Sequence, residues 1–229
     1  MTKVIAIIVA AGKGIRMNTA VRKQYQRVAG FPIVVHTLKT FDSCQMIDEM
    51  LLVIPKEDLE FCHDQIVSPA NLKKKIYLVA GGPKRQDSVY NGLKAIDADY
   101  CIVVIHDGVR PFITNDQLEA CINGAKKHGA CILGIPAYDT LKRVNSKGTI
   151  VTTLERDAIW LAQTPQAFRY DLIKNAHEVA RQQNFTGTDD ASLIEQLGLE
   201  VKILIGSRNN IKITNPEDLK LARILFEGQ

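Results

Sequence analysis

Short apolar runs of strand length alternate with helical patterns through most of the chain, and this alternation limits the folds that it can adopt. The first run, "VIAIIVAA" (4–11), is rich in β-branched residues and has no polar alternation. That composition is typical of a strand buried on both faces. Further strands are expected at 50–55, 75–82, 100–108, 130–137 and 201–206, with helices at 31–41, 57–67, 85–96, 115–129, 171–183, 190–197 and from 216 onward. The pattern predicts an α/β fold with a doubly wound, mostly parallel sheet.

Local signals predict where several of these helices begin and end. Pro32 is the expected first residue of its helix, because the N–H that proline lacks has no partner at that position. Thr114 and Gln117 have the spacing of a capping box, and Gly129 suits the end of the same helix. Asn215 is the expected N-cap of the last helix.

The alternation breaks at "TLKRVNSKGTIVTTLER" (140–156), where two extended, polar-rich segments flank the turn "NSKG". Neither face is apolar enough for a core, and an isolated hairpin is marginally stable in water. We therefore expect a β-hairpin arm at about 139–156 that projects from the body and packs on a second copy of the chain. No linker or repeat divides the sequence, so residues 1–229 are predicted to form a single domain.

Composition narrows the class of protein. Hydrophobic residues make up 46% of the 229 residues, which is enough for a sizeable core. The net charge of +4 is too small to indicate nucleic-acid binding, and no run approaches the roughly 20 apolar residues of a membrane helix. The odd number and scattered spacing of the cysteines argue against disulfides or a zinc site and favour a cytoplasmic protein. The cysteines are Cys44, Cys62, Cys101, Cys121 and Cys131.

The first strand opens into a glycine-containing loop that is rich in cations. The stretch "VAAGKGIRMNTAVRKQYQRVAG" (9–30) has no acid and five cations, namely Lys13, Arg16, Arg22, Lys23 and Arg27. Glycines at 12 and 14 let backbone N–H groups approach an anion, and ligands of doubly wound folds bind at the carboxyl ends of strands. The loop matches neither the dinucleotide fingerprint, because Met17 replaces its third glycine, nor the P-loop. It is predicted to bind phosphate, while Lys13, Arg22 and Arg27 are expected to be ordinary surface cations.

Six motifs together resemble those of the 2-C-methyl-D-erythritol 4-phosphate cytidylyltransferase family. They are "AAGKGIRM", "KQY", "HDGVRPF", "TPQAF", "TDDASLIEQLG" and "NIKITNPEDL", in this order over nearly the whole chain. The resemblance implies a Rossmann-like nucleotidyltransferase fold and a transferase of non-mevalonate isoprenoid (isoprene) biosynthesis. It also implies the reaction, in which CTP and the methylerythritol phosphate give the CDP-alcohol and pyrophosphate with Mg²⁺.

The resemblance assigns roles to cations of the opening loop. Arg16 and Lys23 would stabilise the transition state around the α-phosphate of CTP, and neutralising charge is the main demand of such a transfer. The lack of acids in the loop agrees with that task. Relatives usually have proline where this chain has Arg22, which leaves the approach to Lys23 less constrained.

Further residues are implied for the nucleotide and the metal. Asp107 ends a buried strand, where it is either part of an ordinary turn or, as the resemblance implies, a Mg²⁺ ligand. His106 is expected to be a packed, hydrogen-bonded residue, and Arg110 either supports the site or belongs to the start of the following helix. The nucleotide-binding residues implied by the resemblance are Ala10, Ala11, Gly12, Gly14, Gly82, Ser88 and Asp107.

Arg156 and Lys212 match the residues that position the sugar phosphate in the family, and relatives supply the former across a dimer interface. Taken alone, Arg156 reads as a charge that protects a strand edge, and Lys212 as a solvent-facing residue. The resemblance therefore implies a homodimer formed through the arm. Thr140, Thr164 and Thr188 are the hydroxyl contacts expected for the substrate.

Two other functions remain open on the sequence. A cytidylyltransferase acting on ribitol 5-phosphate would share the opening loop and "TPQ", although the later motifs favour methylerythritol phosphate. A non-catalytic nucleotide sensor on the same fold is the alternative from another class. A sensor has no need of the second phosphate site that Arg156 and Lys212 imply.

Overall fold

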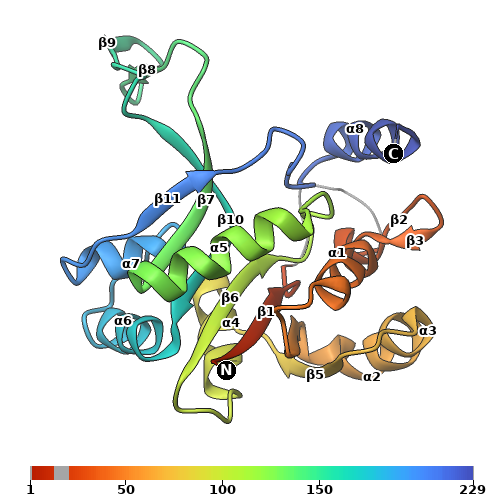
Figure 1. Ribbon diagram of the computed structural model, residues 1–229. Helices are drawn as coiled ribbons and strands as arrows, with labels where there is room; N and C mark the ends of the chain where they lie inside the picture. The colour runs from red at the N-terminus through yellow and green to blue at the C-terminus, as the bar shows by residue number, and fades with distance from the viewer. Residues whose placement is uncertain (1, 13–20, 229) are drawn as a thin grey trace.

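Seven strands form the central sheet of the computed structural model, which describes residues 2–12 and 21–228 (Figure 1). In sheet order the strands are β11 (Lys202–Ile205), β7 (Ala130–Pro136), β10 (Trp160–Arg169), β6 (Cys101–Asp107), β1 (Lys3–Val9), β4 (Glu49–Ile54) and β5 (Lys75–Ala80). Parallel pairing joins β1 to β4 and β6, β4 to β5, and β7 to β11, whereas β10 runs antiparallel to both of its neighbours. The predicted doubly wound, mostly parallel sheet is confirmed.

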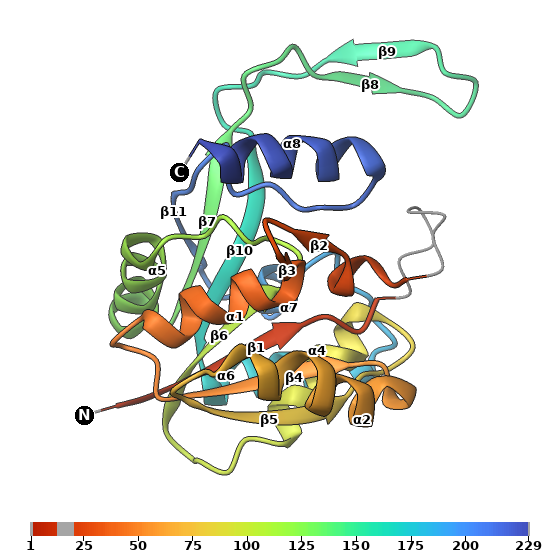
Figure 2. The same ribbon diagram turned by 90° about the vertical axis from the view of Figure 1, so that its right-hand side faces the viewer.

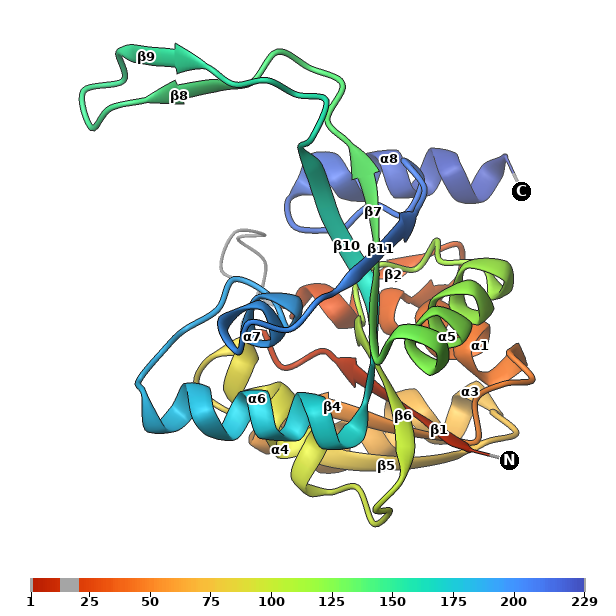
Figure 3. The same cartoon turned by 60° about the vertical axis from the view of Figure 1, so that its left-hand side comes forward.

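Helices cover both faces of the sheet, as the uninterrupted apolar strands require. The helices are α1 (Ile33–Ser43), α2 (Leu59–Cys62), α3 (Ser68–Ala70), α4 (Arg85–Lys94), α5 (Asn115–His128), α6 (Tyr170–Gln182), α7 (Ala191–Gln196) and α8 (Pro216–Glu227). Figure 3 shows α6 and α7 on one side and α1 and α5 on the other. Val4, Ala6 and Ile8 of β1 belong to the core that contains residues of α1 and α5, while Ile5 and Ile7 pack with α4, α6 and α7. None of the described helices is both long and apolar enough to cross a membrane.

A small third core brings the end of the chain to the carboxyl edge of the sheet. Val109, Phe112 and Ile213 pack with residues of α8 and with Val28 and Ile33. The backbone N–H of Ile213 donates to the carbonyl of Val109 at 2.9 Å. Residue 212 is thereby held beside the loop that follows β6.

The predicted hairpin arm is present and stands clear of the sheet. β8 (Lys142–Val144) and β9 (Ile150–Thr153) pair antiparallel around the turn at 145–148. Figure 2 shows this pair projecting above α8, away from the central sheet. The arm is inserted between β7 and β10, which are neighbours in the sheet.

Two details of the predicted elements need correction. Pro32 does not open α1 but precedes it, because β2 (Arg27–Val28) and β3 (Phe31–Pro32) form a short antiparallel ribbon. Positive φ angles at Ala29 (45°) and Gly30 (82°) make the tight turn of this ribbon. The sequence pattern predicts no element at Trp160–Arg169, but this segment forms β10, which lies between β7 and β6 in the central sheet. Its pairing register with β7 shifts between Ala162 and Gln166, around Pro165.

Capping signals were more accurate. Thr114 accepts from the backbone N–H of Gln117, and the side chain of Gln117 accepts from the N–H of Thr114. Gly129 ends α5 with φ 85°, in the left-handed region that glycine tolerates. Asn215 caps α8 as expected, accepting from the N–H of Asp218 at 2.9 Å. The helix predicted at 57–67 is part of a longer helical segment that contains a π turn at His63–Val67.

We predict that Gly124→Ala destabilises the protein, although alanine is the better helix former by about 1 kcal/mol. A Cβ on Gly124 would lie 2.3 Å from Sγ and 3.0 Å from Cβ of the fully buried Cys131. Overpacking of this kind costs roughly 1–3 kcal/mol and should outweigh the helix propensity. Urea unfolding would measure the difference. Asn123→Ala, at the exposed neighbouring position, is the control and should change stability by less than about 0.5 kcal/mol. Equal or greater stability of Gly124→Ala would contradict the packing argument.

Candidate functional site

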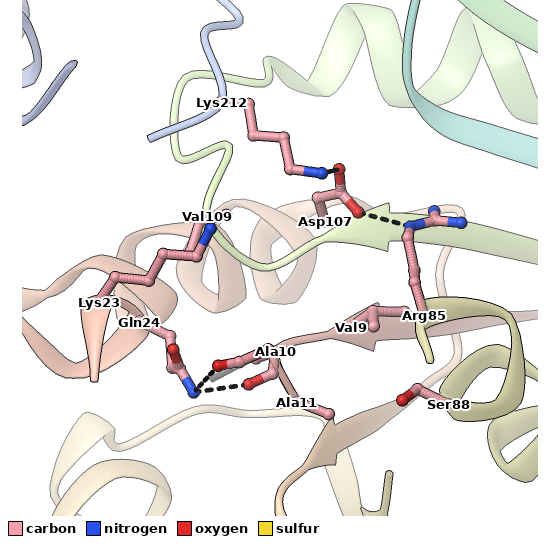
Figure 4. A pocket seen from close by; sticks show the side chains of 11 residues that line it. Val9, Ala10, Ala11, Lys23, Gln24, Arg85, Ser88, Asp107, Val109 and Lys212 are labelled. Carbon is pink, nitrogen blue, oxygen red and sulfur yellow. Dashed lines mark hydrogen bonds and ion pairs between the residues drawn. The ribbon is translucent and has the colours of Figure 1, made fainter. Parts of the chain in front are cut away.

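A pocket opens at the carboxyl edge of the sheet, where the loops after β1 and β6 meet (Figure 4). These loops are adjacent because Val9 and Asp107, the last residues of the two strands, are register partners. Residues from three further segments complete the pocket. Its lining residues are Val9, Ala10, Ala11, Gly12, Lys23, Gln24, Arg85, Ser88, Asp107, Val109 and Lys212.

The loop after β1 is held to the turn that carries Lys23. The amide of Gln24 donates to the carbonyl oxygens of Ala10 (2.8 Å) and Gly12 (3.4 Å), and Gln24 is almost completely buried. The ammonium of Lys23 donates to the carbonyl of Ile213 at 3.3 Å. Two distant segments of the chain are thus connected across the pocket.

Asp107 lies among three cations. Its Oδ2 is 2.7 Å from Nζ of Lys212 and 3.7 Å from Nε of Arg110, and its Oδ1 is 3.0 Å from Nε of Arg85. Burial alone would raise the pKa of Asp107, but the guanidinium of Arg85 and the ammonium of Lys212 hold that pKa well below its usual range. The carboxylate is therefore ionised at any physiological pH and orients the cations around it.

His106 and Thr164 fix the backbone at Asp107. The Thr164 hydroxyl accepts from the backbone N–H of Asp107 and donates to Nδ1 of His106, both at 3.1 Å. The other ring nitrogen, Nε2, then carries the proton and donates to the carbonyl of Arg110 at 3.1 Å. Burial lowers the pKa of His106 to about 4, so the ring is neutral. The expectation that His106 is a packed, hydrogen-bonded residue is confirmed.

A second pocket adjoins the first and shares Arg85, Asp107 and Lys212 with it. Its remaining lining residues come from the loop after β6, from β10, and from the segment that precedes α7. They are Arg110, Ala162, Gln163, Thr164, Gln166, Thr188 and Asp189. Two cations, Arg85 and Lys212, therefore lie on the wall between the two pockets, and Arg110 adds a third positive charge in the second pocket. This arrangement suits two anionic ligands bound side by side.

Gly82 and Ser88 form the turn from β5 into α4. The backbone N–H of Gly82 donates to Oγ of Ser88 at 3.1 Å, and this hydroxyl donates to the carbonyl of Lys84 at 3.1 Å. A Cβ on Gly82 would lie 2.4 Å from Cβ of Asp87. Both residues are required by the turn, and Ser88 also lines the first pocket.

The structure brings together most of the residues predicted for the site. The first pocket contains Ala10, Ala11, Gly12, Lys23, Ser88, Asp107 and Lys212, and the second contains Thr164, Thr188, Asp107 and Lys212. Thr140 and Arg156 line neither pocket; both are exposed on the arm, where Arg156 donates to the carbonyl of Tyr138 at 2.6 Å. Arg16, Gly14 and Lys13 lie outside the described residues.

Sequence reasoning missed Arg85 and Gln24. Arg85 is the first residue of α4, at the positive end of the helix dipole, where an acid is normally favoured. A cation in that unfavourable position is a signal that it has carboxylate partners elsewhere. Gln24 lies inside the quoted motif "KQY", but nothing in the sequence indicates that its amide ties the loop after β1.

The expectation that Arg22 is an ordinary surface cation is wrong. Its guanidinium pairs with Oε1 of Glu57 at 2.5 Å and with Oδ2 of Asp58 at 2.9 Å. Tyr25, two residues after Lys23, packs edge-on against Phe61 with ring centroids 5.2 Å apart. The Lys23 turn is therefore attached to the segment that follows β4 by charge and by ring packing.

Comparison with known proteins identifies relatives over the full length of the chain. The model of the family described as 2-C-methyl-D-erythritol 4-phosphate cytidylyltransferase matches residues 4–227. Proteins of that name from Syntrophus aciditrophicus and Geobacter metallireducens are 51% and 46% identical over 227 residues each. These matches cover 99% and 98% of this chain and 97% of each relative.

Solved structures share the fold. The 4-diphosphocytidyl-2C-methyl-D-erythritol synthase of Anaerococcus prevotii superposes with a TM-score of 0.87 at 35% identity, covering 99% of this chain and 96% of that one. The 2-C-methyl-D-erythritol 4-phosphate cytidylyltransferase of Francisella tularensis gives a TM-score of 0.83 at 33% identity, covering 97% and 99%. The Rossmann-like nucleotidyltransferase fold expected from the motifs is confirmed.

We predict that Arg22→Ala loosens the Lys23 turn, whereas Arg22→Pro does not. Arg22 has φ −57°, close to the value that proline enforces, so proline should restrict the backbone without the ion pairs. Hydrogen exchange of the peptide spanning residues 21–28 should speed up several-fold in Arg22→Ala. In the unmodified protein, the hydrogen-exchange rate of this peptide should rise with added NaCl, because salt screens the ion pairs. In Arg22→Pro the rate should not depend on NaCl. Similar exchange in all three proteins would show that the ion pairs do not restrain this turn.

Proposed function

The chain belongs to the 2-C-methyl-D-erythritol 4-phosphate cytidylyltransferase family, and we infer that it transfers the cytidylyl group of CTP to 2-C-methyl-D-erythritol 4-phosphate. The products are CDP-methylerythritol and pyrophosphate, which places the reaction in non-mevalonate isoprenoid synthesis. The observation that carries this conclusion is the meeting of Lys23, Asp107 and Lys212 at one pocket, with a second pocket on the same wall.

The reaction demands charge neutralisation rather than a base. An oxygen of the acceptor phosphate attacks the α-phosphorus of CTP, a new P–O bond forms, and the bond to the β-phosphate breaks to release pyrophosphate. The acceptor phosphate is already ionised, so no proton has to be removed. Two anionic reactants have to approach each other, and positioned cations supply most of the rate in such transfers. Lys212 and Arg85 already pair with Asp107 at the wall between the two pockets, and Arg110 lies near Asp107 on the side of the second pocket.

We assign the first pocket to CTP. Gly12 supports this choice, because a Cβ there would meet no atom within 4 Å among the described residues, so packing does not require glycine. The open space beside Ala10, Ala11 and Gly12 suits phosphates bound to backbone N–H groups. Lys23 reaches the same space and would stabilise the α-phosphate in the transition state. Arg16 is expected to act with it, although it lies outside the described residues.

We assign the second pocket to the methylerythritol phosphate. Lys212 would position its phosphate, and Thr164 and Thr188 line the same pocket. The hydroxyl of Thr164 already bonds Asp107 and His106, so it supports the site's geometry as well as offering a contact. The shared wall would hold the attacking phosphate beside the α-phosphate.

Mg²⁺ fits this site as a companion of the triphosphate. No group of three or more metal-binding side chains occurs among the described residues, and Asp107 contributes one carboxylate at the pocket. Mg²⁺ typically binds through one or two carboxylates together with substrate phosphates. Asp107 would hold the ion by exchanging one of its present cationic partners for it, and the ion when bound would supply additional positive charge on the phosphates.

We propose that a homodimer formed through the arm completes the site. Val144, Ile150 and Val151 on the arm each expose more than half of their surface. Exposed apolar side chains on a hairpin that is only marginally stable by itself indicate a surface that another protein covers. Packing the arm on a second copy would cover these side chains. It would also carry Arg156 and Thr140 to the second pocket of the partner.

The state of the cysteines supports a cytoplasmic location. All five are free and buried, which fits a reducing compartment.

The identity of the acceptor substrate is tested by measuring pyrophosphate release from CTP. The purified protein should release it with 2-C-methyl-D-erythritol 4-phosphate and Mg²⁺, and not when either is omitted. EDTA should stop turnover without changing the melting temperature of the free protein, since the described residues form no metal site of their own. Faster turnover with ribitol 5-phosphate would overturn the substrate assignment. CTP binding without turnover on either acceptor would favour the sensor.

A mixed dimer tests whether Arg156 of one subunit acts in the site of the other. Lys23→Ala and Arg156→Ala should each lower turnover by roughly 10²-fold or more, with CTP binding preserved in the latter. In a heterodimer of the two variants, purified with two different tags, one site regains both native residues if Arg156 acts across the interface. Its turnover should then return to about half of the native value, because one of two symmetric sites is intact. No recovery would show that Arg156 acts within its own subunit, and full activity of Arg156→Ala on its own would show that the residue plays no part.

A further inference from the structure

Arg85, the first residue of α4, lines both pockets. Its guanidinium reaches two acids at once, with Nε 3.0 Å from Oδ1 of Asp107 and Nη1 2.8 Å from Oδ2 of Asp190. Figure 4 shows the side chain extending from α4 to the level of Asp107. The side chain thus bridges the end of β6 and the start of α7.

The far end of this bridge is firmly held. Asp190 is 1% exposed, and its Oδ1 lies 3.2 Å from Nε2 of the fully buried His177 in α6. Oε1 of Gln166 accepts from the backbone N–H groups of Asp190 and Ala191, both at 3.1 Å. The segment that carries Thr188 and leads into α7 is therefore fixed to β10 and α6.

Stability alone does not explain Arg85. Desolvating two buried carboxylates and part of a guanidinium costs about as much as their attraction returns, so these ion pairs are weak evidence of a stabilising role. Its third nitrogen, Nη2, is also buried and has no hydrogen-bond partner among the described residues, which is a further cost. Because Arg85 carries these desolvation costs and lies where the two pockets meet, its role is better explained by the two parts of the site that it holds together.

We propose that Arg85 is a positioning residue for the transfer reaction, holding Asp107 in register with the segment 188–190 so that the two pockets stay aligned. This rests on the proposed function. Asp107 orients Lys212, and Thr188 and Asp189 line the second pocket, so Arg85 connects the group that orders the shared cations to the wall of the acceptor pocket. Lysine cannot replace it, because a single ammonium lacks the planar fork that reaches both carboxylates.

The test compares Arg85→Lys with Arg181→Lys. Arg181 in α6 pairs with Asp87 of α4 at 3.1 Å, away from both of the pockets described above. The control therefore makes the same arginine-to-lysine change in another ion pair of α4. Arg85→Lys should lower kcat about tenfold to a hundredfold, as misalignment of reactants by about 1 Å does. Its Kd for CTP without acceptor should change less than about threefold, and its KM for the acceptor should rise. Arg181→Lys should leave all three constants within about twofold.

A second variant tests whether Arg85 acts through its fixed end. Asp190→Asn should reduce kcat by a similar factor, and the double variant should be no slower than Arg85→Lys, because both changes break one connection. Circular dichroism and the melting temperature report whether each variant folds, and Arg85→Gln replaces Arg85→Lys if the latter does not. Unchanged kcat in folded Arg85→Lys, or additive losses in the double variant, would overturn the proposal. Failure of the native protein to use either polyol phosphate would instead refute the proposed function, before any variant is compared.

Discussion

A single ionised carboxylate organises the site. Asp107 ends a buried strand and draws Lys212, Arg85 and Arg110 from three different parts of the chain to one place. Three cations would repel one another at this distance without a central negative charge. The carboxylate is in turn held by its backbone, through the hydroxyl of Thr164 and the neutral ring of His106. Strand order, the antiparallel course of β10 and the third core under α8 all serve to bring these groups to the same edge.

Much of the fold was predictable from local sequence. Uninterrupted β-branched runs indicate buried parallel strands, and the caps at Thr114, Gly129 and Asn215 depend only on neighbouring residues. The strand Trp160–Arg169 was missed because Pro165 and several polar residues interrupt its apolar pattern. Its polar side chains are explained by tertiary contacts: Gln163 bonds Ser207 and Gln166 bonds Asp189, partners far away in the sequence. No local periodicity reports such contacts.

The site was predictable to the extent that motifs mark it. Lys23, Asp107 and Lys212 were expected to act together, and the pocket contains all three. The role of Arg85 could not be inferred, because it depends on Asp190 more than a hundred positions later. Arg22 was read as a surface charge because its partners, Glu57 and Asp58, belong to a different segment. Charges are recognisable in a sequence, but their pairing is a property of the fold.

The arm emerges between two strands that are already neighbours. β7 and β10 pair directly, and the N–H of Ala137 donates to the carbonyl of Ile159 where the arm begins and ends. A short loop could join these two positions without removing any pairing of the central sheet. Changes in the length or composition of the arm would therefore leave the central sheet and both pockets in place, so a scaffold of this type could acquire a different acceptor preference by altering a separable appendage.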